Sequence, residues 1–205
     1  MTMKQGTHES GRSMIEMLGV LAIIGVLSVG GIQGYSMAMS KFKVSKTTDQ
    51  IQTMVTNVRT LFAGQRTYKG LEDAATAYTM GIYTDETYKS GDGNGTNAYG
   101  GSIILGGYPK DAPHNFTITY NELPQDACVR IAMSDWGDAS SGLVGLIVEG
   151  STQKAPTAAP KAAAVTDGKG TFLTAEKGVP VPLANAVKAC KGSSDNTSSI
   201  TWIYR

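Results

Sequence analysis

The stretch MIEMLGVLAIIGVLSVGGI, residues Met14–Ile32, decides the fold of this 205-residue chain. Among its nineteen residues only Glu16 is charged. As an α-helix, nineteen residues would span about 28 Å, close to the thickness of the hydrocarbon core of a bilayer. The stretch therefore predicts a membrane-spanning helix near the amino end of the chain.

The residues before this apolar run do not fit an ordinary cleaved signal peptide. Such a peptide begins with a compact basic cluster and ends at small residues in a polar context. Here the leading segment, Met1–Gly11, is polar and includes His8 and Glu9, and the apolar run continues into GGIQGYSMAMSKFK without such a site. A plain membrane anchor remains open on these residues alone.

Glu16 is the unusual residue of the apolar run. A carboxylate at mid-span costs about 2.5–3.5 kcal/mol on insertion scales, and less near an end of the span. Two interpretations are compatible with this cost. The side chain lies near enough to the interface to be hydrated, or a cation compensates its charge, for example an α-amine with a pKa near 8.

The string GRSMIEML, residues Gly11–Leu18, together with the apolar run after it, resembles the prepilin processing signal of type IV pilins. The resemblance implies that a prepilin peptidase cuts between Gly11 and Arg12 and that the apolar segment is retained. Glu16 is then the fifth residue of the mature chain, and its implied role is in assembly, opposite the new amine of a neighbouring subunit. The family usually has phenylalanine or methionine, with a methylated amine, where this chain has Arg12.

The same resemblance implies partners and locations. The chain would be a single-pass inner-membrane protein with a periplasmic head, and would then move through a pilus assembly platform into an extracellular filament. The filament would be a homopolymer held together by the amino-terminal helices. The distribution of lysine and arginine around the span, with Lys41, Lys43 and Lys46 after it, by itself favours the opposite orientation.

The segment beyond Gly34 has the pattern of an amphipathic helix. One apolar stripe at spacing i, i+3, i+4, i+7, i+11 is formed by Ile51, Met54, Val55, Val58 and Phe62. Gly64 is a candidate helix cap. One long helix is expected from about Ser13 to Ala63, with an apolar first half and an amphipathic second half.

The glycines of the apolar half have two possible roles. Gly30 and Gly34 have a spacing that permits close contact between helices. Alternatively, Gly25, Gly30, Gly31 and Gly34, as weak helix formers, allow this stretch to unwind in a filament. The sequence does not separate the two roles.

The rest of the chain alternates short helices and strands. Strands are expected at 102–105, 115–120, 143–148 and 200–204, and short helices within 71–80, 123–133 and 181–190, while 90–101 and 151–164 have loop compositions. The predicted fold class is α+β, a long amino-terminal helix packed on an antiparallel sheet. The expected regions are a leader at 1–11, a transmembrane and filament-core half at 12–34, and a head at 35–205 that includes the amphipathic half 35–63.

Two cysteines, Cys128 and Cys190, lack the neighbouring ligands of a zinc site. On the residues alone they are free thiols or one disulfide. The segments LPQDACVRIAM and CKGSSDNTSSITWIYR resemble type IVb pilins, in which two cysteines bridge a variable carboxyl-terminal region. That resemblance implies a Cys128–Cys190 disulfide.

No catalytic constellation is evident, so the sequence does not favour an enzyme. His114 stands alone between Pro113 and Asn115, and Asn115-Phe116-Thr117 fits a glycosylation pattern that is common by chance. No cofactor and no metal site are expected, and a net charge of +1 does not favour nucleic acid as a direct ligand. The expected function is a major pilin. The alternatives are a minor pilin or type II secretion pseudopilin and, more distantly, a membrane-anchored periplasmic enzyme.

Overall fold

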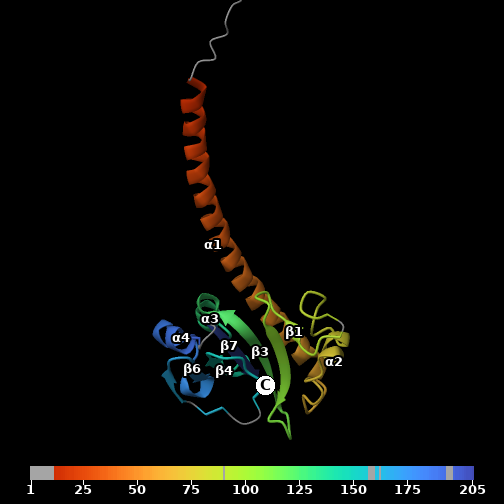
Figure 1. Ribbon diagram of the computed structural model, residues 1–205. Coiled ribbons are helices and arrows are strands. Elements are labelled where there is room, and N and C mark those ends of the chain that lie inside the picture. The colour runs from red at the N-terminus through yellow and green to blue at the C-terminus, as the bar shows by residue number, and fades with distance from the viewer. Residues whose placement is uncertain (1–11, 90, 157–159, 162, 193–195) are drawn as a thin grey trace, which may run out of the picture. The chain divides into compact units, whose positions relative to one another are not determined.

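The computed structural model describes residues 12–89, 91–156, 160–161, 163–192 and 196–205 (Figure 1). The predicted leader, residues 1–11, therefore lies outside the described residues. The chain divides between Phe42 and Lys43 into two units. Helix α1 comprises Arg12–Phe62. Its residues up to Phe42 belong to the first unit, and its residues from Lys43 onward belong to the second.

The second unit is a sheet-and-helix head. Its seven antiparallel strands have the order β1-β2-β3-β7-β4-β6-β5. The strands are β1 (Gly95–Thr96), β2 (Ser102–Tyr108), β3 (Asn115–Pro124), β4 (Leu143–Glu149), β5 (Ala163–Thr166), β6 (Lys169–Leu173) and β7 (Thr197–Tyr204). The helices are α2 (Ala74–Thr79), α3 (Gln125–Ala132) and α4 (Leu183–Ala189), with a 3-10 turn at Thr174–Glu176. The α+β prediction, including the long helix, the antiparallel sheet and the short helices, is confirmed.

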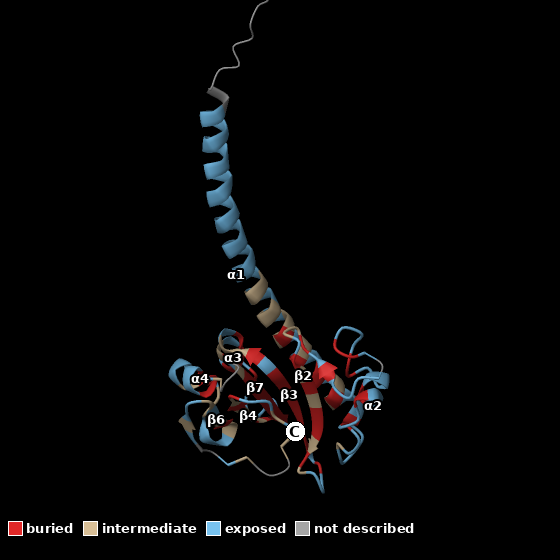
Figure 2. Cartoon of the chain, viewed as in Figure 1, coloured by how far each residue is buried: buried red, intermediate tan, exposed pale blue. Residues whose placement is uncertain are grey.

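The amphipathic half of α1 packs on the sheet as its stripe predicts. All five stripe residues are buried, and Ile51 and Val58 are fully so (Figure 2). They join the core residues of the central strands, where the Tyr120 hydroxyl lies 3.8 Å from the Met54 sulfur. Burial of apolar side chains contributes about 1.5–3 kcal/mol each, so this stripe is a major attachment of the helix to the sheet.

The last strand, β7, lies in the middle of the sheet between β3 and β4. Trp202, fully buried on β7, contacts Tyr120 and Trp136 edge to face, with ring centroids 5.8 Å and 4.9 Å away. Such aromatic pairs add about 0.5–1.5 kcal/mol beyond burial of their area. The carboxyl-terminal segment is therefore an integral part of the core.

Several local expectations need correction. Helix α1 ends at Phe62, and Gly64 lies in the following turn without a left-handed backbone, so it is not a left-handed glycine cap. The short helix expected within 123–133 is α3, and it begins only at Gln125, because Leu123 and Pro124 are the last residues of β3. Part of the predicted loop 90–101 forms the short strand β1, and the end of the predicted loop 151–164 belongs to β5.

Arg59 of α1 contacts the last residues of the chain, at the end of β7, through a hydrogen bond and a cation–π contact. Its Nε donates to the main-chain oxygen of Arg205 at 3.3 Å, and its guanidinium lies 4.9 Å from the Tyr204 ring centroid. Gly142 leaves room for this arrangement, since a Cβ at that position would lie 2.5 Å from Arg59 Nη2. Gly142 also has a positive φ of 82°, which residues with a side chain rarely adopt.

Replacing Gly142 with alanine should lower the free energy of unfolding by about 1–3 kcal/mol, because the new methyl group meets Arg59 in a strained backbone. The measurement is denaturant unfolding of the full chain in detergent, followed by tryptophan fluorescence. Gly64→Ala is the matched control, because a Cβ there meets no atom within 4 Å. Equal stability of the two variants would contradict this account of Gly142.

Candidate functional site

The first candidate site is the apolar half of α1. Every side chain from Met14 to Ala38 is exposed, including Ile15 at 76% and Val26 at 75% (Figure 2). In the described part of the chain, α1 is the one helix long and apolar enough to cross a membrane. So much apolar surface is unfavourable in water, and it fits a lipid environment or the helices of other subunits.

The residues predicted for processing and assembly lie at the start of this helix. Gly11 falls outside the described residues, and α1 begins at Arg12. Glu16 is an exposed residue of the second turn of α1, and the first turn contains no acidic residue. Cleavage at Gly11 and the role of Glu16 in assembly stay predictions.

The glycines of the apolar half are not required by packing within the chain. A Cβ added at Gly25, Gly30, Gly31 or Gly34 would meet nothing within 4 Å. Each glycine nevertheless costs a helix about 1 kcal/mol relative to alanine. Contact with other helices and a change of helix conformation, the two roles considered from the sequence, are both compatible with this open surface.

The second candidate site is the disulfide-bonded side of the head. Cys128 of α3 and Cys190, which caps α4, form a disulfide across 62 residues, and both cysteines are fully buried. The predicted Cys128–Cys190 bond is confirmed. The Ser198 hydroxyl donates to the main-chain oxygen of Cys190 at 2.9 Å and so connects the bond to strand β7.

An ion pair beside this disulfide joins the β5–β6 turn to the end of α4. Lys191 Nζ lies 2.7 Å from Asp167 Oδ2. The hydrogen bond from Lys191, and then its charge, lower the pKa of the Asp167 carboxyl. Both side chains are largely exposed, so this pair adds little to stability.

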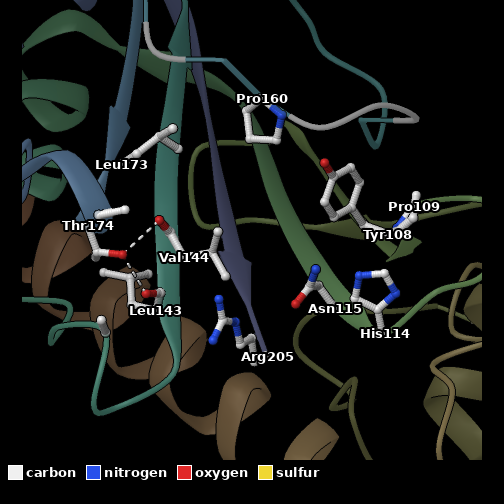
Figure 3. Close-up of a pocket in the computed structure, with 12 residues that line it drawn as sticks. Tyr108, Pro109, His114, Asn115, Leu143, Val144, Pro160, Leu173, Thr174 and Arg205 are labelled. Atoms are coloured by element: carbon white, nitrogen blue, oxygen red, sulfur yellow. Dashed lines mark hydrogen bonds between the residues drawn. The ribbon is translucent and has the colours of Figure 1, made fainter.

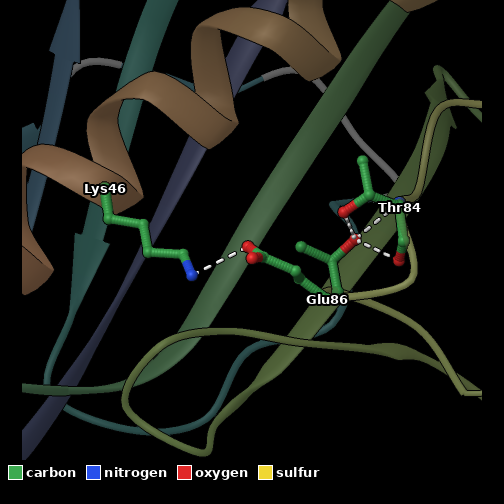
Figure 4. A network of polar contacts seen from close by, with 4 residues as sticks. Lys46, Thr84 and Glu86 are labelled. Carbon is green, nitrogen blue, oxygen red and sulfur yellow. Dashed lines mark hydrogen bonds and ion pairs between the residues drawn. The ribbon is translucent and has the colours of Figure 1, made fainter.

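A further ion pair connects α1 to the segment after α2. Lys46 Nζ lies 2.7 Å from Glu86 Oε2, and Figure 4 shows the two side chains meeting beside Thr84. Glu86 lies in a turn formed by residues 84–87. In this turn the Thr87 hydroxyl accepts from the Thr84 amide at 2.9 Å. Sequence reasoning missed this pair, because its partners are 40 residues apart and only the tertiary fold brings them together.

A buried asparagine cluster holds two loops on strand β3. Asn97 Nδ2 donates to the Asn121 main-chain oxygen at 2.8 Å, and the amide of Gln153 donates to Asn121 Oδ1 at 2.8 Å. Asn97 and Asn121 are 5% and 0% exposed. Sequence analysis missed this cluster, and its only signal was asparagine at the ends of glycine-rich or strand-like segments.

Asn115, the asparagine of the glycosylation pattern, is buried in the folded head. Asn115 is only 8% exposed and pairs with Tyr108 in the β2–β3 ladder. An acceptor side chain must reach an enzyme, so the buried position argues against modification of the folded head.

Comparisons with known proteins agree with this architecture. The chain is 25% identical over 201 residues to the major structural subunit of the bundle-forming pilus of Escherichia coli O127:H6, covering 97% of this chain and 95% of that protein. The corresponding subunit of Escherichia coli O111:H- is 26% identical over 202 residues, with the same coverage.

Two crystal structures share the fold. The type IV pilin TcpA of Vibrio cholerae El Tor has a TM-score of 0.56 at 15% identity, covering 80% of this chain and 99% of that one. A type IVb pilin of Salmonella typhi has a TM-score of 0.52 at 23% identity, covering 78% and 99%. At these identities the likeness establishes the type IV pilin fold. Residues 41–203, most of the chain, match the family described as PilS N terminal, and the chain therefore belongs to that family.

Proposed function

We propose that this chain is the major structural subunit of a type IV pilus of the type IVb class. The observation that carries the proposal is the apolar half of α1, exposed along its whole length from Met14 to Ala38, on a chain with a pilin head. A soluble monomer would have no use for such a segment. A filament core made of packed helices buries it, and the two relatives from Escherichia coli are named as major pilus subunits.

The proposed pathway begins in the inner membrane. The apolar helix holds the precursor there as a single pass, with the head in the periplasm, where the Cys128–Cys190 disulfide can form and persist. Prepilin peptidase removes residues 1–11, and the assembly platform transfers the mature chain into an extracellular filament. The filament serves adhesion, aggregation, motility or mating.

Within the filament, Glu16 provides a fixed negative charge at one level of the helical core. Removal of the leader creates an α-amine at Arg12, four residues earlier. A stagger of about one helical turn, 5.4 Å, between neighbouring subunits brings the amine of one subunit to the carboxylate of another. Charge pairing inside the core would then set the register of successive subunits.

Cleavage between Gly11 and Arg12 is expected to leave a mature chain of 194 residues, since 205 minus 11 is 194. Intact-mass measurement of the surface protein, with fragmentation of its first residues, gives the cut and any methyl group on the new amine. A Gly11→Ala precursor should accumulate uncut in the membrane. A surface protein that retains Met1–Gly11 would contradict the proposed processing.

The composition of sheared surface filaments tests the assignment as major pilin. This chain should be their most abundant protein, and deletion of its gene should remove the filaments. A minor pilin would be present in trace amounts, and a pseudopilin would leave the filaments intact while protein secretion fails. Either outcome would overturn the major-pilin assignment, although the family membership would stand.

A further inference from the structure

Three asparagines of the chain begin an Asn-x-Ser/Thr triplet, the pattern of an acceptor for N-linked glycans: Asn94, Asn115 and Asn196. The triplet alone is common by chance, so the fold has to distinguish the three. An enzyme that recognises the triplet must reach both the asparagine amide and the hydroxyl two residues later. The exposure of these two groups in the head is therefore the deciding observation.

The fold closes two of the three triplets. Asn115 borders the pocket of about 410 Å³ in Figure 3, but its side chain is 8% exposed and Thr117 is fully buried. Asn196 is exposed, but Ser198, which would supply the hydroxyl, is 1% exposed and donates to the main-chain oxygen of Cys190 at 2.9 Å. Neither triplet offers both groups to an enzyme.

The third triplet, Asn94-Gly95-Thr96, lies open at the edge of the sheet, where β1 is the outermost strand. Asn94 and Thr96 are exposed, whereas Gly95 is buried, and a Cβ at Gly95 would lie 2.6 Å from Tyr83 Cε1. The Thr96 amide donates to the Thr87 main-chain oxygen at 2.6 Å. The main chain is therefore held in place while both side chains of the triplet stay accessible.

Asp92 adds a negative charge to this exposed segment. It lies two residues before Asn94 and is itself exposed, and a Cβ at the intervening Gly93 would meet nothing within 4 Å. Within the part of the chain that the structure describes, the side chains of Asp92, Asn94 and Thr96 make no hydrogen bond or ion pair. A carboxylate pairs strongly with arginine, so an enzyme can recognise Asp92 together with the amide and the hydroxyl. Neither of the other two triplets has an acid at this position.

We propose that Asn94 is an acceptor for N-linked glycosylation by a membrane oligosaccharyltransferase that recognises Asp92, Asn94 and Thr96. The donor is an oligosaccharide joined to a lipid through pyrophosphate. Asn94 Nδ2 attacks the anomeric carbon of the first sugar, a nitrogen–carbon bond forms, and the bond between that carbon and the pyrophosphate oxygen breaks. The amide loses one proton to a base of the enzyme, and the lipid pyrophosphate leaves with the electron pair. The inference rests on the proposed periplasmic location of the head and not on filament assembly.

The test is peptide mass spectrometry of the protein sheared from its native cell surface, and of the full-length chain produced in a bacterial host that carries such an enzyme and its lipid-linked donor. In both samples the peptide that contains Asn94 should carry the glycan. The oxidation state of Cys128 and Cys190 in the same samples reports whether the head reached the periplasm. An unmodified Asn94 in disulfide-bonded protein overturns the inference and leaves the proposed function intact. An unmodified Asn94 with reduced cysteines overturns the proposed location as well.

Variants identify the groups that the enzyme recognises. Asn94→Gln should abolish the modification, and Asp92→Asn and Thr96→Val should each lower the modified fraction about tenfold, as expected for the loss of one strong hydrogen bond to the enzyme. Asp111→Asn, which removes an exposed acid outside this segment, is the matched control and should leave the modification unchanged. All four positions are exposed, so the variants should keep the folded head. The inference is overturned if one of the other two triplets carries the glycan instead, or if Asp92→Asn has no larger effect than Asp111→Asn.

Discussion

Glu16→Ala should abolish filament assembly or slow it strongly, while membrane insertion and cleavage of the precursor continue. Insertion should continue because the change makes the apolar run more apolar, and cleavage because the expected cut lies at Gly11. In the proposed filament core, however, each incoming α-amine would lose its carboxylate partner. Leaving one charge of a buried pair without its partner costs about 3–5 kcal/mol, which is enough to prevent addition of subunits.

Two further variants separate the charge of Glu16 from its other properties. Glu16→Gln keeps a hydrogen-bond acceptor without the charge and should have an intermediate filament yield. Ser28→Ala is the matched control in the same helix, because the Ser28 hydroxyl donates to the Ile24 main-chain oxygen, one turn away, at 2.7 Å. It should assemble normally.

Co-expression of Glu16→Ala with the unchanged chain gives the most direct readout. The measured quantity is the fraction of mutant subunits in sheared filaments, relative to their fraction in the membrane. We expect strong depletion of the mutant from filaments. If Glu16→Ala alone forms filaments at normal yield, Glu16 is a hydrated interfacial acid and the pairing mechanism is wrong, although the pilin assignment can stand.

Loss of the disulfide is the second large effect that we expect. Replacing both Cys128 and Cys190 with alanine should lower the free energy of unfolding by about 2–5 kcal/mol. The two cysteines are 62 positions apart in the sequence, and the segment between them contains strands β4 to β6 and helix α4. Without it, the unfolded chain gains the entropy of an open loop, and α3 and α4 keep only their packing contacts.

Denaturant unfolding of the full chain in detergent measures this effect, and filament yield measures its consequence. The double alanine variant is preferable to a single one, because it leaves no thiol that could form bonds between subunits. Reduced unchanged protein serves as the matched comparison and should be destabilised to a similar degree. If both thiols of surface-derived protein react with an alkylating reagent before any reduction, the disulfide is absent from the mature filament and the prediction fails.

The secondary structure was predicted best where local pattern and burial agree. The stripe of Ile51, Met54 and Val58 indicated the packed face of α1. The alternation of residues 115–120 located β3, although the structure buries all six of these residues. Strands β1, β5 and β6 were missed. The sequences of β1 and β5, Gly95–Thr96 and Ala163–Thr166, have no alternation that would distinguish them from loops. Pairing with β2 and β6 supplies the hydrogen bonds that make them strands.

The sequence by itself determined the apolar helix, its acid at Glu16 and the α+β class, because these follow from the composition and period of neighbouring residues. Only the tertiary structure decided that Arg59 lies against Tyr204 and that Lys46 meets Glu86. The physical reason is separation along the chain. Contacts between residues 40 to 146 positions apart depend on the order and register of the strands, which no local pattern contains.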